Sequence, residues 1–142
     1  MKKVFFCFVL TIFGLGACVS DSQLKQLDPY YVFHENNSKV WLIDHLYKDN
    51  MDHAPISTVY KEVMIFHKNK VCYVYKLKEI GEKKGKKADF TLDATEKEMR
   101  FIFHNERWIF ELILVSHNKI ILRPKNGSKF LYTIELIPLP EF

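Results

Sequence analysis

Side chains that could do chemistry are few in this 142-residue chain, which has three cysteines and six histidines. A Gly-x-Ser-x-Gly turn, a Cys–His pair at a recognisable spacing and a glycine-rich phosphate loop are all absent from the sequence. Asp93 and Glu96 resemble the carboxylate pair of a glycosidase only in type, because acidic residues beside a predicted turn are usually solvated. The sequence therefore predicts a protein that is not an enzyme.

Metal chemistry would have to come from the histidines and nearby carboxylates. Asp49, Asp52 and His53 share the predicted loop at residues 48–55, which a strand meander would place at the same end as His104. Two histidines and two carboxylates can bind Zn²⁺. The spacing Asp-x-x-Asp-His matches no compact ligand motif, however, and histidines in turns are usually solvated. We therefore predict no metal ion and no cofactor.

The N-terminus has the pattern of a secretory signal. Lys2 and Lys3 precede the apolar run at residues 4–13, and small residues follow before Cys18. This run is too short to span a bilayer, and no stop-transfer sequence follows it. Because Cys7 would leave with the signal, Cys72 has no partner for a disulfide within the domain; it lies in a strand pattern typical of a buried, inert thiol.

The segment Leu15-Gly16-Ala17-Cys18 resembles the lipobox of bacterial lipoproteins. The resemblance implies cleavage before Cys18, which then becomes the first residue of the mature protein and carries acyl chains such as palmitate. Each buried CH₂ contributes about 0.8 kcal/mol, so two or three chains hold a protein on a membrane. Val19 after the cysteine favours the outer membrane over the inner one and leaves open which face of it the protein occupies.

The remaining charge is nearly balanced. Loss of Lys2 and Lys3 leaves 19 basic against 17 acidic side chains, which argues against a nucleic-acid partner. The densest charge is a predicted hairpin tip that contains four lysines: Lys83, Lys84, Lys86 and Lys87. This tip is either a solvated loop that opposes aggregation or a contact for anionic surfaces such as lipopolysaccharide or phospholipid headgroups.

The chain is predicted to divide into a signal peptide (1–17), the lipidated cysteine with a polar tether (18–28) and a single β domain (29–142). Alternating apolar residues predict eight strands, at residues 39–47, 57–67, 70–80, 87–92, 97–104, 107–116, 119–123 and 129–137. No convincing helix is predicted. Short links force antiparallel neighbours, so we expect an all-β meander that closes into a barrel; an open sheet or a β-sandwich is the alternative.

The tryptophan of Lys39-Val40-Trp41 on an early strand, the meander and the apolar interior resemble the small lipocalin-like lipoproteins of Bacteroidota. This resemblance implies a closed barrel in which Arg123 takes the place of the arginine that packs on the tryptophan.

An eight-stranded barrel is wide enough either to be filled by side chains or to hold one small ligand. The abundance of large rings favours a filled core, whereas a small apolar ligand would be lined by Tyr73, Tyr75, Phe101, Trp108, Phe110 and Tyr132.

The opposite face of the strands is also partly apolar and could dock on a partner. Its members are Cys72, Val74, Ile102, Ile109, Ile113, Val115, Ile121 and Leu131. We therefore expect a membrane-anchored accessory or interaction subunit of an envelope complex. The alternatives are a module that binds a small apolar ligand and a small inhibitor of a foreign enzyme.

Overall fold

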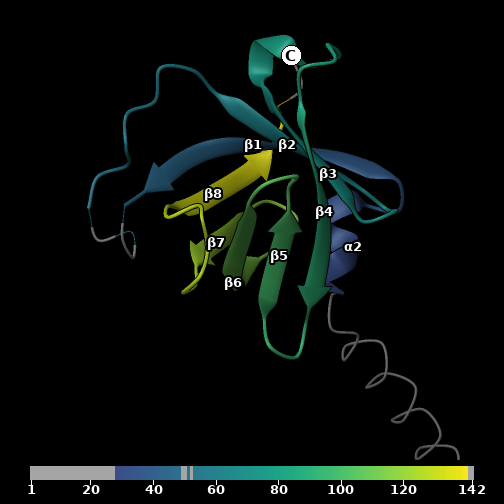
Figure 1. The fold of residues 1–142 in the computed structure, drawn as a ribbon, viewed down its shortest axis with the longest axis vertical. Helices are drawn as coiled ribbons and strands as arrows, with labels where there is room; N and C mark the ends of the chain where they lie inside the picture. Colours follow the sequence, from purple (N-terminus) through teal and green to yellow (C-terminus); the bar gives the residue numbers. More distant parts are fainter. Residues whose placement is uncertain (1–27, 49–50, 52, 141–142) are drawn as a thin grey trace, which may run out of the picture.

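The computed structural model describes residues 28–48, 51 and 53–140, so the signal region and Cys18 lie outside the described residues. In this part of the chain one short helix, α2 (Pro29–His34), precedes eight strands, and a 3-10 turn, η1 (Leu77–Glu79), follows the third (Figure 1). The strands are β1 (Ser38–Tyr47), β2 (Glu62–His67), β3 (Val71–Lys76), β4 (Lys86–Asp93), β5 (Glu98–Ile102), β6 (Arg107–Val115), β7 (Ile120–Pro124) and β8 (Thr133–Pro138).

The eight strands form a closed antiparallel barrel in sequence order. Each strand pairs with the next one along the chain, and β1 also pairs with β8. The predicted meander and its closure are thereby confirmed, and the open sheet and the sandwich are excluded. Closure removes the exposed edges that a flat meander of this length would present.

The strands predicted at 57–67 and 70–80 are the most strongly shortened in the structure, because a strand needs a partner as well as a propensity. The strand expected at 57–67 begins only at Glu62, since pairing between β1 and β2 ends at Leu42 and Val63. Beyond that point β1 has a bulge and pairs with β8 instead. The strand expected at 70–80 ends at Lys76, where η1 follows.

Helix α2 was not predicted, although its start signals are present in the sequence. The Asp28 carboxylate accepts a hydrogen bond from the Tyr30 N–H at 3.0 Å. Pro29 occupies the first turn, where a backbone N–H would have no acceptor within the helix, so the missing N–H of proline costs nothing. The helix closes one end of the barrel: Phe33 is fully buried, its ring lies 4.8 Å from that of Phe66, and its carbonyl accepts the Trp41 indole N–H at 3.0 Å.

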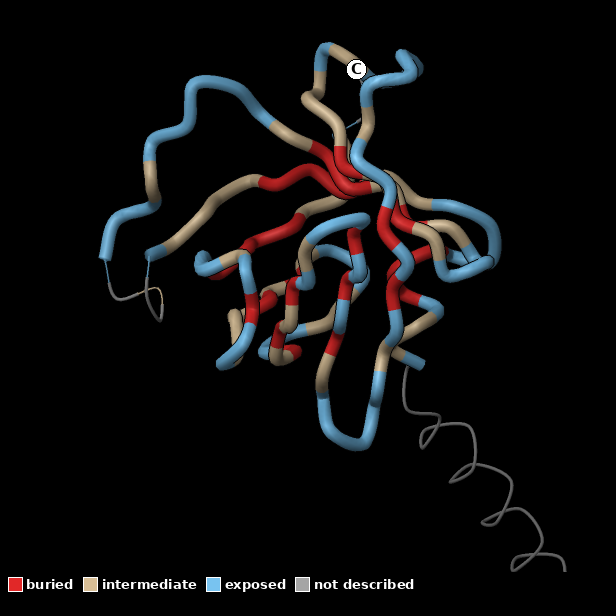
Figure 2. Tube along the Cα trace, in the orientation of Figure 1, coloured by how far each residue is buried: buried red, intermediate tan, exposed pale blue. Residues whose placement is uncertain are grey.

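Aromatic side chains fill the interior. The rings of Phe66, Phe90, Phe101 and Phe110 are all fully buried and meet at centroid distances of 5.3 to 6.3 Å. Angled contacts of this kind suit the charge distribution of aromatic rings. Buried and exposed positions alternate along β4 and β5 (Figure 2). The filled core that the sequence favours is therefore confirmed.

The two faces of β3 are the reverse of those predicted. Cys72 and Val74 are buried against Phe66 and Met64, their partners on β2, whereas Tyr73 and Tyr75 are only half-buried on the outside. Both faces of β3 are apolar, so alternation alone could not tell which one faces inward. The buried setting of Cys72 is confirmed, and desolvation raises the pKa of its thiol well above the ordinary value.

Three further expectations are corrected. Tyr132 is exposed, because β8 begins only at Thr133. Val115 packs against the core rather than facing outward, since a bulge in β6 shifts the alternation after Leu112. The cation that lies over the Trp41 ring is that of Lys39 rather than Arg123, and its Nζ is 4.3 Å from the ring centroid.

Arg123 does not take the role that the lipocalin resemblance implies. Its guanidinium bonds the Glu111 carboxylate at 2.6 Å on the outer face of the barrel.

Removing a core ring should be far more costly than trimming its exposed neighbour. Phe101→Ala is expected to lower the free energy of unfolding by about 3–5 kcal/mol because it leaves a cavity among packed rings. Ile102→Ala, at a side chain that is 52% exposed on the next position of β5, is the matched control and should cost less than about 1 kcal/mol. Denaturant unfolding measures both. Equal losses would contradict the inward assignment of Phe101.

Candidate functional site

The end of the barrel opposite α2 is open and carries charged side chains at inward-facing positions. Helix α2 lies beside the link between β2 and β3, where the Tyr30 hydroxyl donates to the Lys68 carbonyl. The links β1–β2, β3–β4, β5–β6 and β7–β8 therefore gather at the other end. On β3 and β4 the inward row passes from buried Val74 and Ala88 to Lys76 and Lys86.

A cavity of about 390 Å³ opens at this end, and we call it the barrel mouth. Its volume is near the lower limit of small-molecule sites, which range over roughly 300–1,000 Å³. It combines four lysines, three glutamates and four apolar or aromatic side chains: Lys76, Lys84, Lys86, Lys129, Glu62, Glu79, Glu106, Tyr60, Val74, Trp108 and Phe130.

One wall of the barrel mouth is aromatic. The Trp108 ring lies 4.6 Å from the ring of Phe130 and 4.4 Å from that of Phe103. Its indole N–H donates to the Glu106 carboxylate at 3.1 Å, which fixes the orientation of the ring and engages one of the glutamates. This wall is consequently rigid and apolar, with a single occupied polar edge.

Lysines line the barrel mouth together with these rings. Lys76 Nζ lies 4.5 Å from the centroid of the Tyr60 ring, and Lys84 pairs with Glu82 at 3.2 Å. Within the part of the chain that the structure describes, neither Lys86 nor Lys129 forms an ion pair with a carboxylate. The ammonium groups of Lys86 and Lys129 thus lack a direct ion pair in the described residues, and Glu62 interacts with Lys86 only at longer range.

The pKa of Glu62 reflects both burial and the lysines nearby. Burial of its carboxyl group raises the pKa of Glu62, and the nearby ammonium groups of Lys86 and Lys76 lower it by less. Glu62 is the direct cross-strand partner of Lys76. The loss of hydration around the Glu62 carboxylate thus affects its pKa more than the attraction of the two lysines does.

The structure brings together only part of the residues that the sequence singled out. Among the six ligand-lining candidates Trp108 alone lines the barrel mouth, while Phe101 and Phe110 belong to the packed core. From the lysine-rich tip, Lys84 and Lys86 line the mouth, and Lys83 and Lys87 do not.

Sequence reasoning missed Glu62, Lys76 and Lys129 as members of the barrel mouth. A signal for two of them existed. Glu62 and Lys76 continue the inward rows of β2 and β3 by one step, as charged residues directly beyond buried apolar ones.

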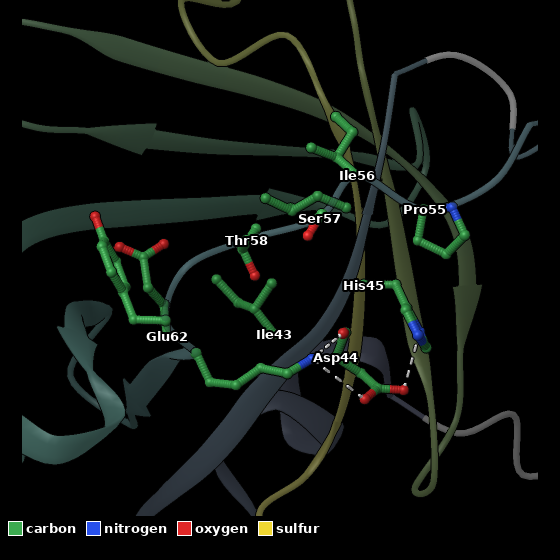
Figure 3. Close-up of a pocket in the computed structure, with 11 residues that line it drawn as sticks. Ile43, Asp44, His45, Pro55, Ile56, Ser57, Thr58 and Glu62 are labelled. Atoms are coloured by element: carbon green, nitrogen blue, oxygen red, sulfur yellow. Dashed lines mark hydrogen bonds and ion pairs between the residues drawn. The ribbon is translucent and has the colours of Figure 1, made fainter.

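A second group of polar side chains lies on the outer surface, beside a cavity of about 310 Å³ between β1 and residues 55–62 (Figure 3). The bulge in β1 places Asp44 next to His45, whose Nδ1 lies 3.1 Å from Asp44 Oδ2 and 3.8 Å from Glu135 Oε1. One ligand atom from each residue would fit around a metal ion. Lysines already form ion pairs with these carboxylates, however. Lys119 Nζ lies 3.4 Å from Glu135 Oε1, and Lys61 Nζ lies 4.0 Å from Asp44 Oδ1. The group is an ion-pair network.

The histidine and aspartate set considered from the sequence is not assembled in the described residues. His53 and His104 are exposed in different links. Asp49 and Asp52 lie outside the described residues.

An apolar patch on the outer face is formed by Ile113, Leu114 and Ile121, which we call the β6–β7 patch. The bulge in β6 leaves two consecutive side chains outside, Ile113 at 44% and Leu114 at 42% exposure, and Leu114 pairs with Ile121 on β7. Ile102 and Leu131 are also exposed, as expected, whereas Cys72 and Val74 belong to the core.

Comparison with known proteins identifies no relative. No protein family, no curated protein and no solved structure matches the chain. Among the described residues, no helix has the length and apolar character needed to cross a membrane.

The raised pKa of Glu62 has a measurable consequence for stability. A carboxyl group whose folded pKa exceeds its unfolded value destabilises the folded protein when ionised, and that cost disappears as the pH falls through the folded pKa. Glu62→Gln should therefore raise the Tm at pH 7, with little difference from the natural protein at about pH 4. Glu79→Gln removes the same charge from the same cavity and should not raise the Tm. Thermal unfolding of the natural protein and the two variants at both pH values tests this prediction. A lower Tm for Glu62→Gln at pH 7 would show that attraction to the lysines outweighs the cost of burying the carboxylate.

Proposed function

We propose that this protein is a lipid-anchored, non-catalytic β-barrel of the bacterial cell envelope and acts as an accessory or interaction subunit of an envelope complex. The observation that carries the proposal is the filled interior. Phe66, Phe90 and Phe110 are fully buried and each contacts the buried ring of Phe101, which supports a function outside the barrel core rather than binding of an apolar ligand within it. Function is then left to the outer surface and to the open end.

The β6–β7 patch supports docking on a protein partner. A bulge usually re-aims side chains and is kept in a strand for a reason. Here it turns two consecutive apolar residues, Ile113 and Leu114, toward solvent, beside the Arg123–Glu111 ion pair. An apolar centre with charged residues at its rim is the composition of a protein-binding surface.

The anchor rests on the sequence of the N-terminus. A charged start, an apolar run and Leu15-Gly16-Ala17-Cys18 resemble a lipoprotein signal, and acyl chains on Cys18 would hold the barrel at a membrane surface, with the outer membrane favoured by Val19. A tethered domain meets membrane-bound partners at a high effective concentration, so even a small patch suffices for association.

Lipidation is tested with a pair of cysteine variants. Cys18→Ala should move the protein from the membrane fraction of its host to the soluble fraction or leave it as the uncleaved precursor, because no thiol remains to carry the acyl chains. Cys72→Ala, at a buried thiol of the barrel, is the control and should stay in the membrane fraction. Fractionation and intact mass spectrometry measure the outcome. An unlipidated natural protein would refute the anchor.

The docking role is tested by affinity purification of the full-length protein from its host in mild detergent. We expect a stoichiometric envelope protein with the natural chain and at least tenfold less of it, roughly what loss of a central contact costs, with Leu114→Glu. Leu131→Glu introduces the same charge at a side chain that is 67% exposed in the β7–β8 link and should retain the partner. Recovery of the protein alone, or equal capture by both variants, would overturn docking through the β6–β7 patch.

A further inference from the structure

The barrel mouth places lysines without a direct ion pair beside an aromatic wall in one cavity. Lys86 and Lys129 line it without forming an ion pair in the described residues, and Trp108 and Phe130 line the same cavity. An anionic group that enters would form charge-assisted hydrogen bonds with the ammonium groups, and these are about twice as strong as neutral ones. The attached apolar part would find the aromatic wall beside it.

The depth of the cavity limits the size of the ligand. Trp108 and Val74 are buried except for the edge that faces the mouth, and Phe110 beneath them is fully buried. A long acyl chain therefore cannot extend into the barrel. With about 390 Å³ available, the site suits a small molecule whose ring or short alkyl group lies against Trp108.

Two of the glutamates of the mouth already interact with neighbouring groups of the protein. Glu106 already accepts the Trp108 indole N–H, and Glu62 lies within the influence of Lys76 and Lys86. Four lysines and three glutamates line the cavity, and Lys86 and Lys129, which form no ion pair among the described residues, have side chains long enough to reach an incoming anion.

We propose that the barrel mouth binds a small amphiphilic anion, in which a phosphate or carboxylate group contacts Lys86 and Lys129 and an attached ring or short alkyl group packs on Trp108 and Phe130. This site is separate from the β6–β7 patch and does not depend on the proposed docking role.

The experiment titrates phenyl phosphate into the full-length protein, held in a neutral maltoside detergent, and follows the two tryptophan indole N–H signals by NMR. The Trp108 signal should shift and saturate, because its donor lies in the mouth, whereas the Trp41 signal should not, because it is bonded to Phe33 at the closed end. Inorganic phosphate and phenyl glucoside, which lack the apolar part and the anion respectively, should each bind at least tenfold more weakly.

Two double variants of equal charge locate the site. Lys86→Gln with Lys129→Gln should weaken phenyl phosphate about tenfold or more, as the loss of two charge-assisted contacts predicts. Lys83→Gln with Lys87→Gln removes the same charge outside the mouth and should leave the affinity unchanged. Retention of both indole signals shows that each variant is folded.

Three outcomes would overturn the proposal. The first is a titration in which the Trp108 signal does not move, and the second is an equal loss of affinity in both double variants. The third is binding only to vesicles that contain phosphatidylglycerol, with the lysines outside the mouth mattering as much as those inside it. That last result would assign the lysine-rich tip to an anionic membrane surface instead.

Discussion

The barrel closes through β1, which pairs with β2 along one edge and with β8, the last strand, along the other. The first part of β1 pairs with β2 from Ser38 to Leu42, and a later part pairs with β8 from Trp41 to Tyr47. A bulge between Ile43 and His45 bends the strand just beyond the point where its pairing with β2 ends. Trp41 lies where the two pairings overlap, and its indole bonds the carbonyl of Phe33. The same short stretch therefore joins the two ends of the sheet and holds α2 against the closed end.

The closed barrel then determines where function can lie. Its interior is packed with rings, one end is covered by α2, and backbone pairing runs all the way around. A protein of this construction cannot enclose a ligand as a wide barrel does. Interaction is left to the open end and to outward side chains, and both locations depart from simple alternation. A bulge exposes Leu114 on the outer face, and charged residues replace apolar ones at inward positions of the open end.

The number of strands, their antiparallel order and the closure could be predicted because they follow from local signals, namely alternation and short links. The faces of β3 could not, because Cys72 and Val74 compete with two larger tyrosines, and only the pairing with β2 decides which face is buried. The bulge in β6 has no reliable local signal and reversed the assignment of Val115. Helix α2 is too short for a period to show, and only Asp28 and Pro29 indicate it. The barrel mouth required the register, because Glu62, Lys76 and Lys86 lie on three different strands.

The same register shows which residues determine how deep the open end of the barrel is. Along β3 the inward row contains Cys72 and Val74, both buried, and then Lys76. Two residues advance a strand by about 6.5 Å, so the step from apolar to charged marks the level at which water enters the barrel. A lysine one step deeper would lose its hydration beside Phe66 and Met64, at a cost no protein anion there could offset. At the level where they occur, Lys76 and Lys86 line the barrel mouth one step beyond buried Val74 and Ala88 and make the rim of the barrel polar.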